Sequence, residues 1–305
     1  MDFLYVLEGL RMEPVTSIMS ALTYLGTQYV FVAIGLIMLW CISKRQAYYL
    51  FAVSLLGTIA NQWLKLLFCI PRPWVLDSSF SIVESAREMA AGYSFPSGHT
   101  QAAVGTFAAI AIANKRRWLR VACVIVIALV PFSRMYLGVH TPLDVGVAFA
   151  CAIAVAFALW PCFKDEQRFT ACTPFVLGGA ITLCIAFTVW VNVNPFPADV
   201  DAENLAEGMK NAWQLLGLAL GLAVSYYVDQ RFLHFEVKAP LPGQILKCVL
   251  GIALFAAIYF GLKPLLAALF GAVWWPYAIR TFLAVLFVGC LWPLTFPFFA
   301  RIGAK

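Results

Sequence analysis

Long apolar segments separated by short polar turns constrain this chain more than any other feature of its sequence. A helix needs about 20 predominantly apolar residues to cross the hydrocarbon core of a bilayer, and only helices and closed barrels satisfy the backbone there. The candidate segments are residues 16–42, 47–69, 98–114, 121–138, 142–160, 174–192, 211–228, 244–262 and 277–298. The sequence therefore predicts an all-α fold, a polytopic transmembrane helical bundle of about nine spans.

Composition supports a membrane protein and excludes several other classes. Of the 305 residues, 63% are hydrophobic and 12% are charged, whereas a soluble domain is about half apolar and about a quarter charged. The net charge of +6 is not concentrated in any cationic block long enough to indicate a nucleic-acid partner. The chain contains no N-x-S/T sequon, which favours a bacterial source and hence the bacterial cytoplasmic membrane.

The basic residues alternate along the chain in a way that predicts its sidedness. Clusters follow the first, third, fifth, seventh and ninth segments, at Lys44 and Arg45, Lys115 to Arg120, Lys164 and Arg168, Arg231 and Lys238, and Arg301 and Lys305. The positive-inside rule assigns these turns to the cytoplasm. The opposite side carries an acidic loop at 197–208. The N-terminus is then outside, the C-terminus is cytoplasmic, and the loop at 70–97 is extracytoplasmic.

Three polar stretches lie at segment ends on this outer face. The first contains Lys65 and Arg72, which alone could be a snorkelling lysine and an interfacial arginine. The second is Pro96-Ser97-Gly98-His99, at the start of a segment. Ser97 suits a helix N-cap, and free amides in the following turn suit an anion such as phosphate. A plain cap beside a surface histidine is the alternative interpretation.

The third stretch runs from Ser133 to Asp144 and contains the second histidine of the outer face. Thr141-Pro142 predicts a helix start, so Asp144 lies four residues from His140 and on the same side. A carboxylate there can hold one imidazole nitrogen and leave the other free as a nucleophile or base. Arg134 has the planar fork that suits a phosphate, although a structural Arg134–Asp144 pair is an alternative. Together, the cations, histidines and helix-end amides indicate phosphoryl transfer.

The three stretches resemble the three-part signature of the type 2 phosphatidic acid phosphatase (PAP2) superfamily. The matching positions are Lys65, Arg72, Pro73, Pro96, Ser97, Gly98, His99, Ser133, Arg134, His140 and Asp144. The resemblance implies that His140 is the nucleophile, Asp144 orients it and His99 protonates the leaving oxygen. It also implies phosphate binding by Lys65, Arg72, Ser97, Gly98 and Arg134, a phosphohistidine intermediate, and neither a metal nor another cofactor.

The resemblance covers a PAP2-like catalytic core of four spans, expected at residues 47–160. Residues 1–46 then form an N-terminal segment with the first span, and residues 161–305 add further spans. The expected activity is hydrolysis of a lipid phosphate or diphosphate, such as an isoprenyl diphosphate, a lipid of the phosphatidic acid type or a sphingoid phosphate. A lipid-phosphate transporter or flippase, a phosphotransferase and a sugar-phosphate phosphatase are the alternatives.

Overall fold

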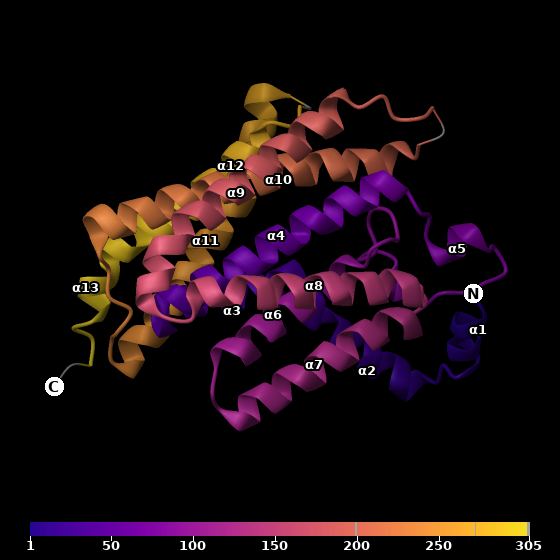
Figure 1. The fold of residues 1–305 in the computed structure, drawn as a ribbon, viewed down its shortest axis with the longest axis horizontal. Coiled ribbons are helices and arrows are strands. Elements are labelled where there is room, and N and C mark those ends of the chain that lie inside the picture. The colour runs from indigo at the N-terminus through magenta and orange to yellow at the C-terminus, as the bar shows by residue number, and fades with distance from the viewer. Residues whose placement is uncertain (199, 272, 304–305) are drawn as a thin grey trace. The chain divides into compact units, whose positions relative to one another are not determined.

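The computed structural model describes residues 1–305 except 199, 272, 304 and 305, and every regular element in that part is a helix. The predicted all-α class is therefore confirmed (Figure 1). The α-helices are α1 (Asp2–Gly9), α2 (Glu13–Thr23), α3 (Gln28–Ile37), α4 (Lys44–Phe68), α5 (Pro73–Leu76), α6 (Gly98–Ala113), α7 (Arg117–Tyr136), α8 (Pro142–Phe163), α9 (Glu166–Val193), α10 (Ala202–Val228), α11 (Leu241–Phe270), α12 (Pro276–Leu286) and α13 (Phe296–Phe299). Lys305 and Asp199, from the predicted cytoplasmic end and the acidic loop, lie outside the described residues.

Three of the predicted membrane segments contain a wider π-helical turn or are directly followed by one. These turns are η2 (Met38–Ile42), η4 (Asp229–Leu233) and η5 (Phe287–Leu291). Short 3₁₀ turns complete the described structure, at η1 (Tyr24–Gly26), η3 (Glu84–Ala86) and η6 (Trp292–Thr295). The turns η2 and η4 end their helices, since extended Ser43 and left-handed His234 follow them, whereas η5 continues into η6.

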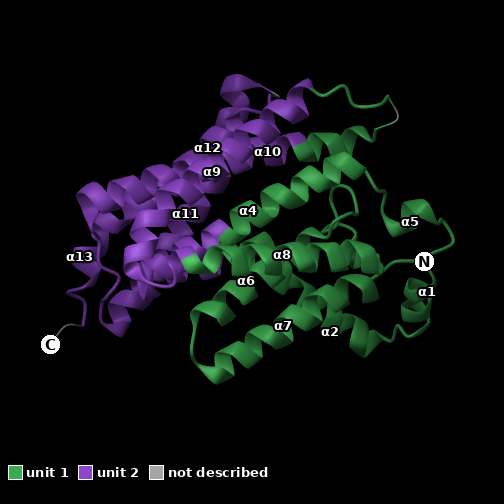
Figure 2. Cartoon of the chain, in the orientation of Figure 1, with its two compact units in different colours: residues 1–32, 53–161, 194–208 green, residues 33–52, 162–193, 209–305 purple. Residues whose placement is uncertain are grey.

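The chain forms two compact units, which Figure 2 colours separately. Unit 1 comprises residues 1–32, 53–161 and 194–208, and unit 2 comprises residues 33–52, 162–193 and 209–305. Each unit therefore combines segments that are distant in sequence. The domain boundaries predicted after residues 46 and 160 stay predictions.

Unit 1 is built around α6 and α7, an antiparallel pair joined by a turn of three residues (Figure 1). An apolar cluster packs the loop at residues 70–97 onto the C-terminal end of α7. Its buried members are Leu4, Phe80, Ile82, Ala86, Ala90, Tyr136, Leu137 and Val139. This loop consequently has a hydrophobic base of its own, although it contains little regular structure.

Unit 2 packs its helices closely at small residues, as helices in membranes commonly do. A side chain at Gly217 in α10 would collide with the backbone of Ala278 in α12. One at Gly221, one turn further along α10, would collide with the side chain of Val285 in α12. The absence of side chains at these two glycines therefore lets α10 and α12 approach closely, with backbone against backbone at Gly217.

The predicted number of nine spans is not confirmed. Within the described residues, six segments are long and apolar enough to cross a membrane, and a seventh is possible if α2 and α3, bent by 52°, count as one span. Helix α6 has 16 residues, which reach only about 24 Å at 1.5 Å per residue, against a core of about 30 Å. Helix α10 is not among these segments either, and polar residues such as Glu203, Lys210 and Gln214 occupy its N-terminal half.

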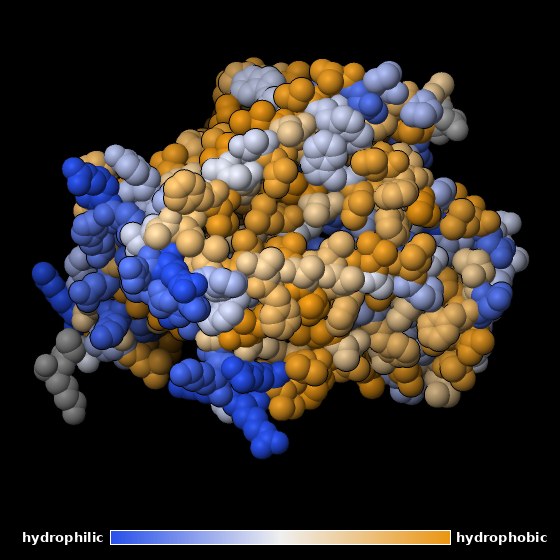
Figure 3. All heavy atoms as spheres, in the orientation of Figure 1, coloured by the Kyte–Doolittle hydropathy of each residue, from blue (hydrophilic) through white to orange (hydrophobic). Residues whose placement is uncertain are grey.

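The surface of unit 1 agrees with a membrane location. Trp118, Val121, Val124 and Ile125 of α7 are all exposed. Figure 3 shows apolar atoms over this helix and hydrophilic side chains at the turn between α6 and α7. Exposed apolar side chains in such number are expected where lipid, rather than water, surrounds a helix.

Candidate active site

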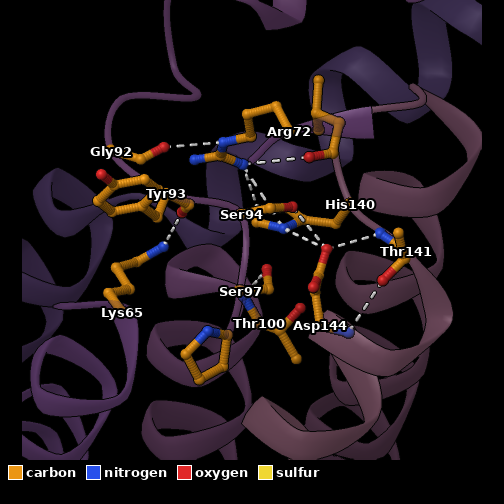
Figure 4. Close-up of polar contacts among 12 residues, drawn as sticks. Lys65, Arg72, Gly92, Tyr93, Ser94, Ser97, Thr100, His140, Thr141 and Asp144 are labelled. Carbon is orange, nitrogen blue, oxygen red and sulfur yellow. Dashed lines mark hydrogen bonds and ion pairs between the residues drawn. The ribbon is translucent and has the colours of Figure 1, made fainter. Parts of the chain in front are cut away.

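The ends of four helices in unit 1 bring the three polar stretches together. Lys65 lies in the last turn of α4 and Arg72 follows that helix. Ser97 caps α6, Arg134 lies in the last turn of α7, and Asp144 lies in the first turn of α8. His140 connects α7 to α8. Figure 4 shows most of these side chains directed toward a common centre.

His140 and Asp144 form the buried middle of the site. Both residues are 1% exposed, and His140 Nδ1 lies 3.4 Å from Asp144 Oδ2. The same carboxylate oxygen accepts hydrogen bonds from Ser94 Oγ at 2.6 Å and from the Thr141 amide at 2.8 Å. Asp144 is therefore held by donors on two sides and presents a fixed negative charge to the imidazole.

The start of α8 explains this precision of placement. Thr141 precedes the helix. Its Oγ1 accepts a hydrogen bond from the Asp144 amide at 3.2 Å, and Asp144 Oδ2 accepts one from the Thr141 amide. This reciprocal arrangement is a capping box, here with aspartate as the third helical residue. The helix start predicted at Thr141-Pro142 is confirmed, and it also orients the carboxylate.

Arg72 determines which nitrogen of His140 carries a lone pair. Its guanidinium donates to the carbonyls of Ala91, Gly92 and Val139 at 2.9–3.1 Å. Nη1 also lies 2.9 Å from His140 Nε2. Because arginine has only donors, Nε2 is the acceptor and the proton of the neutral ring is on Nδ1, toward Asp144. Nε2 is thus the nitrogen available to react.

Arg134 is 0% exposed and only partly satisfied by the protein. Its Nη1 donates to Thr23 Oγ1 at 2.9 Å, whereas Nε and Nη2 have no acceptor in the described part of the chain. Two buried guanidinium donors without partners are costly. They match the bidentate geometry with which arginine binds a phosphate.

The first turn of α6 supplies further donors. Ser97 Oγ accepts the Thr100 amide at 3.3 Å, which confirms the predicted N-cap. Space is open around Gly98, since an added Cβ there would meet nothing within 4 Å. His99 Nε2 is buried and has no partner among the described residues. A helix N-terminus of this kind favours an anion.

The cluster holds more positive charge than the protein neutralises. Lys65 donates to the Tyr93 carbonyl and is buried, as are Arg72 and Arg134, while Asp144 is the one carboxylate among the predicted site residues. Burial lowers the pKa of His140 well below its usual range, and the charges of Arg72, Arg134 and Lys65 lower it further. The imidazole is therefore neutral near pH 7, and the excess charge is suited to an anionic ligand.

Sequence reasoning missed three contributors to this geometry. Ser94 donates a hydrogen bond to Asp144, the Tyr93 carbonyl accepts one from Lys65, and the Thr23 hydroxyl accepts one from Arg134. Ser94 directly precedes Phe95 in the polar stretch of the second motif, so its position there was an available signal. Thr23 belongs to the first apolar segment. A threonine in such a helix commonly donates its hydroxyl to a carbonyl of the same helix, and nothing in the sequence shows that Thr23 instead contacts Arg134.

Comparisons with known proteins agree with this geometry. The family model "PAP2 superfamily" matches residues 46–168, and the model "PAP2 superfamily phosphatase, transmembrane extension" matches residues 213–303. The chain is 30% identical over 166 residues to undecaprenyl-diphosphatase BcrC of Bacillus subtilis (strain 168), covering 52% of this chain and 80% of that protein. No solved structure matches. The chain belongs to the PAP2 superfamily, and it carries the transmembrane extension found in phosphatases of that superfamily.

Proposed function

We propose that this chain hydrolyses a lipid phosphate or diphosphate through a phosphohistidine formed on His140. One observation carries the proposal: a buried neutral imidazole has Nδ1 facing Asp144 and its Nε2 lone pair directed into a cluster of unneutralised cations. A binding protein needs the cations alone. The carboxylate behind the histidine has a clear purpose only if the ring attacks a substrate.

The chemistry proceeds in two balanced steps. Nε2 of His140 attacks the terminal phosphorus, so that an N–P bond forms as the P–O bond to the leaving group breaks, which is the lipid alcohol of a monophosphate or the lipid monophosphate of a diphosphate. His99, protonated when the anionic substrate is bound, supplies its proton to the departing oxygen. Water then attacks phosphorus and gives a proton back to His99, the N–P bond breaks, and phosphate leaves with both histidines regenerated. Asp144 stabilises the positive charge that the ring acquires in the first step.

Three cations and one helix start stabilise the transition state. Arg134 offers Nε and Nη2, and the free amides of the first turn of α6 offer further donors. Arg72 donates to Nε2 in this structure, so a bound phosphoryl group replaces this contact and accepts from Arg72 in place of Nε2. Lys65 adds a third charge from α4. Donors prearranged around developing negative charge are among the largest contributions to catalysis.

An isoprenyl diphosphate is the substrate class we place first. A relative that aligns with this chain over 80% of its own length is named an undecaprenyl-diphosphatase. The helix ends that form the site continue into apolar helices of unit 1, so His140 lies at the end of such helices, a position suited to the head group of a membrane lipid. Lipids of the phosphatidic acid type and sphingoid phosphates share that chemistry. The positive-inside distribution supports an extracytoplasmic site.

Phosphate release by the purified protein in detergent tests this proposal. Isoprenyl diphosphate, phosphatidic acid, sphingoid phosphate and a sugar phosphate are each offered with EDTA present, and His140→Ala serves as the blank. Release that disappears in the variant supports the proposal, and the preferred compound identifies the substrate class. Transfer of the phosphoryl group to an added alcohol in place of water would instead indicate a phosphotransferase. Tight lipid binding without release would favour a transporter.

A further inference from the structure

A buried arginine lies in unit 2, within the transmembrane extension. Arg280 is in the first half of α12 and is 6% exposed. It forms no ion pair with any residue that the structure describes. An arginine inside a membrane-spanning segment is costly and normally has a functional partner. The missing counter-charge is therefore the feature to explain.

The surroundings of Arg280 come from three helices. Its guanidinium carbon lies 4.3 Å from the ring centre of Tyr259 in α11 and 5.1 Å from that of Tyr277. Nη2 donates to the Tyr259 hydroxyl at 3.1 Å, and Gln214 Nε2 of α10 approaches the same oxygen at 3.4 Å. Since that oxygen accepts from both neighbours, the hydroxyl proton of Tyr259 stays available to donate outward.

The cluster has a donor left over. Arg280 Nε is buried and has no acceptor within the described residues. A guanidinium has only donors and cannot accept a hydrogen bond. The chemistry that satisfies this donor, together with the outward hydroxyl of Tyr259, is an anion with several acceptor oxygens, as a phosphate has.

The position along the helix indicates where such an anion comes from. Arg280 is the fifth residue of the membrane-spanning segment Pro276–Phe299, about 6 Å from its start at 1.5 Å per residue. Trp274, Trp275 and Tyr277 precede it, in the pattern of an interfacial aromatic belt. Phe260 follows Tyr259 on α11, and Leu283 lies three residues after Arg280 on α12. Both are exposed apolar side chains. This is the depth of lipid head groups, with apolar surface for the chains.

We infer that Arg280, Tyr259 and Gln214 form a binding site for the phosphate head group of a membrane lipid. All three residues belong to unit 2, whereas the catalytic cluster lies in unit 1. The site is therefore additional to the phosphatase chemistry. Free phosphate has the same head-group chemistry, and the experiment below separates the two sources.

Native mass spectrometry of the purified full-length protein in a neutral detergent tests the inference. The probe is phosphatidylglycerol, whose phosphodiester does not offer the terminal phosphoryl group that His140 is proposed to attack. Arg280→Gln is expected to weaken its binding about tenfold or more. Lys263→Gln is the matched control, because Lys263 is an exposed cation on α11, and its removal is expected to change binding less than about twofold.

The outcomes are distinguishable from one another and from failure of the proposed function. If millimolar inorganic phosphate displaces the lipid in an Arg280-dependent way, the phosphate site is supported with free phosphate as its ligand. Equal binding by wild type and Arg280→Gln, or an equal loss in Lys263→Gln, overturns the inference. Should Arg280→Gln not fold, Tyr259→Phe decides: about threefold weaker binding is expected, and unchanged binding overturns the site. Phosphate release by Tyr259→Phe is expected to equal that of wild type.

Discussion

Contacts on both edges of the His140 ring hold it in one orientation, which suits the nucleophile that we propose it to be. We expect His140→Ala to lower turnover at least about a thousandfold, since removal of a nucleophile leaves only binding and electrostatic stabilisation. Binding of the unreacted lipid phosphate is expected to remain within about threefold, as Arg72 and Arg134 are intact. Turnover and equilibrium binding measured on the same preparation check this.

The third histidine of the chain provides the control for that experiment. His234 has a positive φ of 46° and its Nδ1 lies 2.8 Å from the Asp229 carbonyl in unit 2. Asparagine tolerates such a backbone better than most residues, so His234→Asn tests loss of an imidazole without added strain. Its turnover is expected to match wild type. A loss in His234→Asn comparable with that in His140→Ala would contradict a specific role for His140.

Substitution of His99 is expected to have a different kinetic effect, because we propose that His99 acts on the leaving group. Its Nε2 has no partner among the described residues and is free to donate to a departing oxygen. We expect His99→Ala to slow an alkyl or lipid phosphate by about a hundredfold to ten-thousandfold. An aryl phosphate with an acidic phenol needs no proton and is expected to be slowed far less. Equal slowing of both substrates would count against this role.

The pH dependence follows from the charges around His140. Burial and three neighbouring cations lower its pKa, so the reactive neutral ring persists as the pH falls below the ordinary histidine value of about 6.5. The fall in kcat/KM on the acid side of the pH profile, where His140 becomes protonated, is therefore expected below pH 6.5. Lys65→Gln removes one of these charges and should move this fall toward higher pH. A pH–rate profile of both proteins measures the shift, and a fall above pH 6.5 in the wild type would contradict it.

The start of α8 links helix stability to catalysis. Thr141 and Asp144 exchange hydrogen bonds across the first turn, and the loss of a capping side chain costs about 1 kcal/mol. Thr141→Ala is expected to lower stability by about that amount and to lower kcat more than KM, because Asp144 is less firmly held. Thr141→Ser retains the hydroxyl and should restore both. Thermal unfolding and kinetics of the pair test this, and a serine variant as impaired as alanine would argue against the cap.

The charge distribution of the molecule predicts its orientation in the bilayer. Within unit 1 the candidate site lies at the α6 N-terminus and the α7 C-terminus, whereas Lys115 and Arg116 lie in the turn at the opposite helix ends. Single cysteines at Lys115 and at Glu203, in a background without other reactive thiols, are expected to react with an impermeant maleimide from opposite sides. Glu203 should label from outside intact cells. Labelling of both from one side would contradict the proposed topology.

The sequence was sufficient for some of the site because the motifs lie at helix ends. Ser97 and Thr141-Pro142 carry local capping signals, and both helix starts occur where those signals predict. The four-residue spacing of His140 and Asp144 depends only on the local backbone. Span number was less predictable. Short or polar helices such as α6 and α10 depend on neighbouring helices for burial, and apolar length alone does not reveal that.

By itself, the sequence determined the membrane-embedded, all-α character of this protein, because that follows from local composition. Its motifs and their resemblance to the PAP2 signature also predicted the residues of the candidate site. Tertiary structure alone decided how those residues are held. Thr23 binds Arg134 across 111 positions, and Ser94 binds Asp144 across 50. The unneutralised donors of Arg280 likewise became apparent only when three helices met. A hydrogen bond between distant segments depends on packing, and packing leaves no periodic signal in a single sequence.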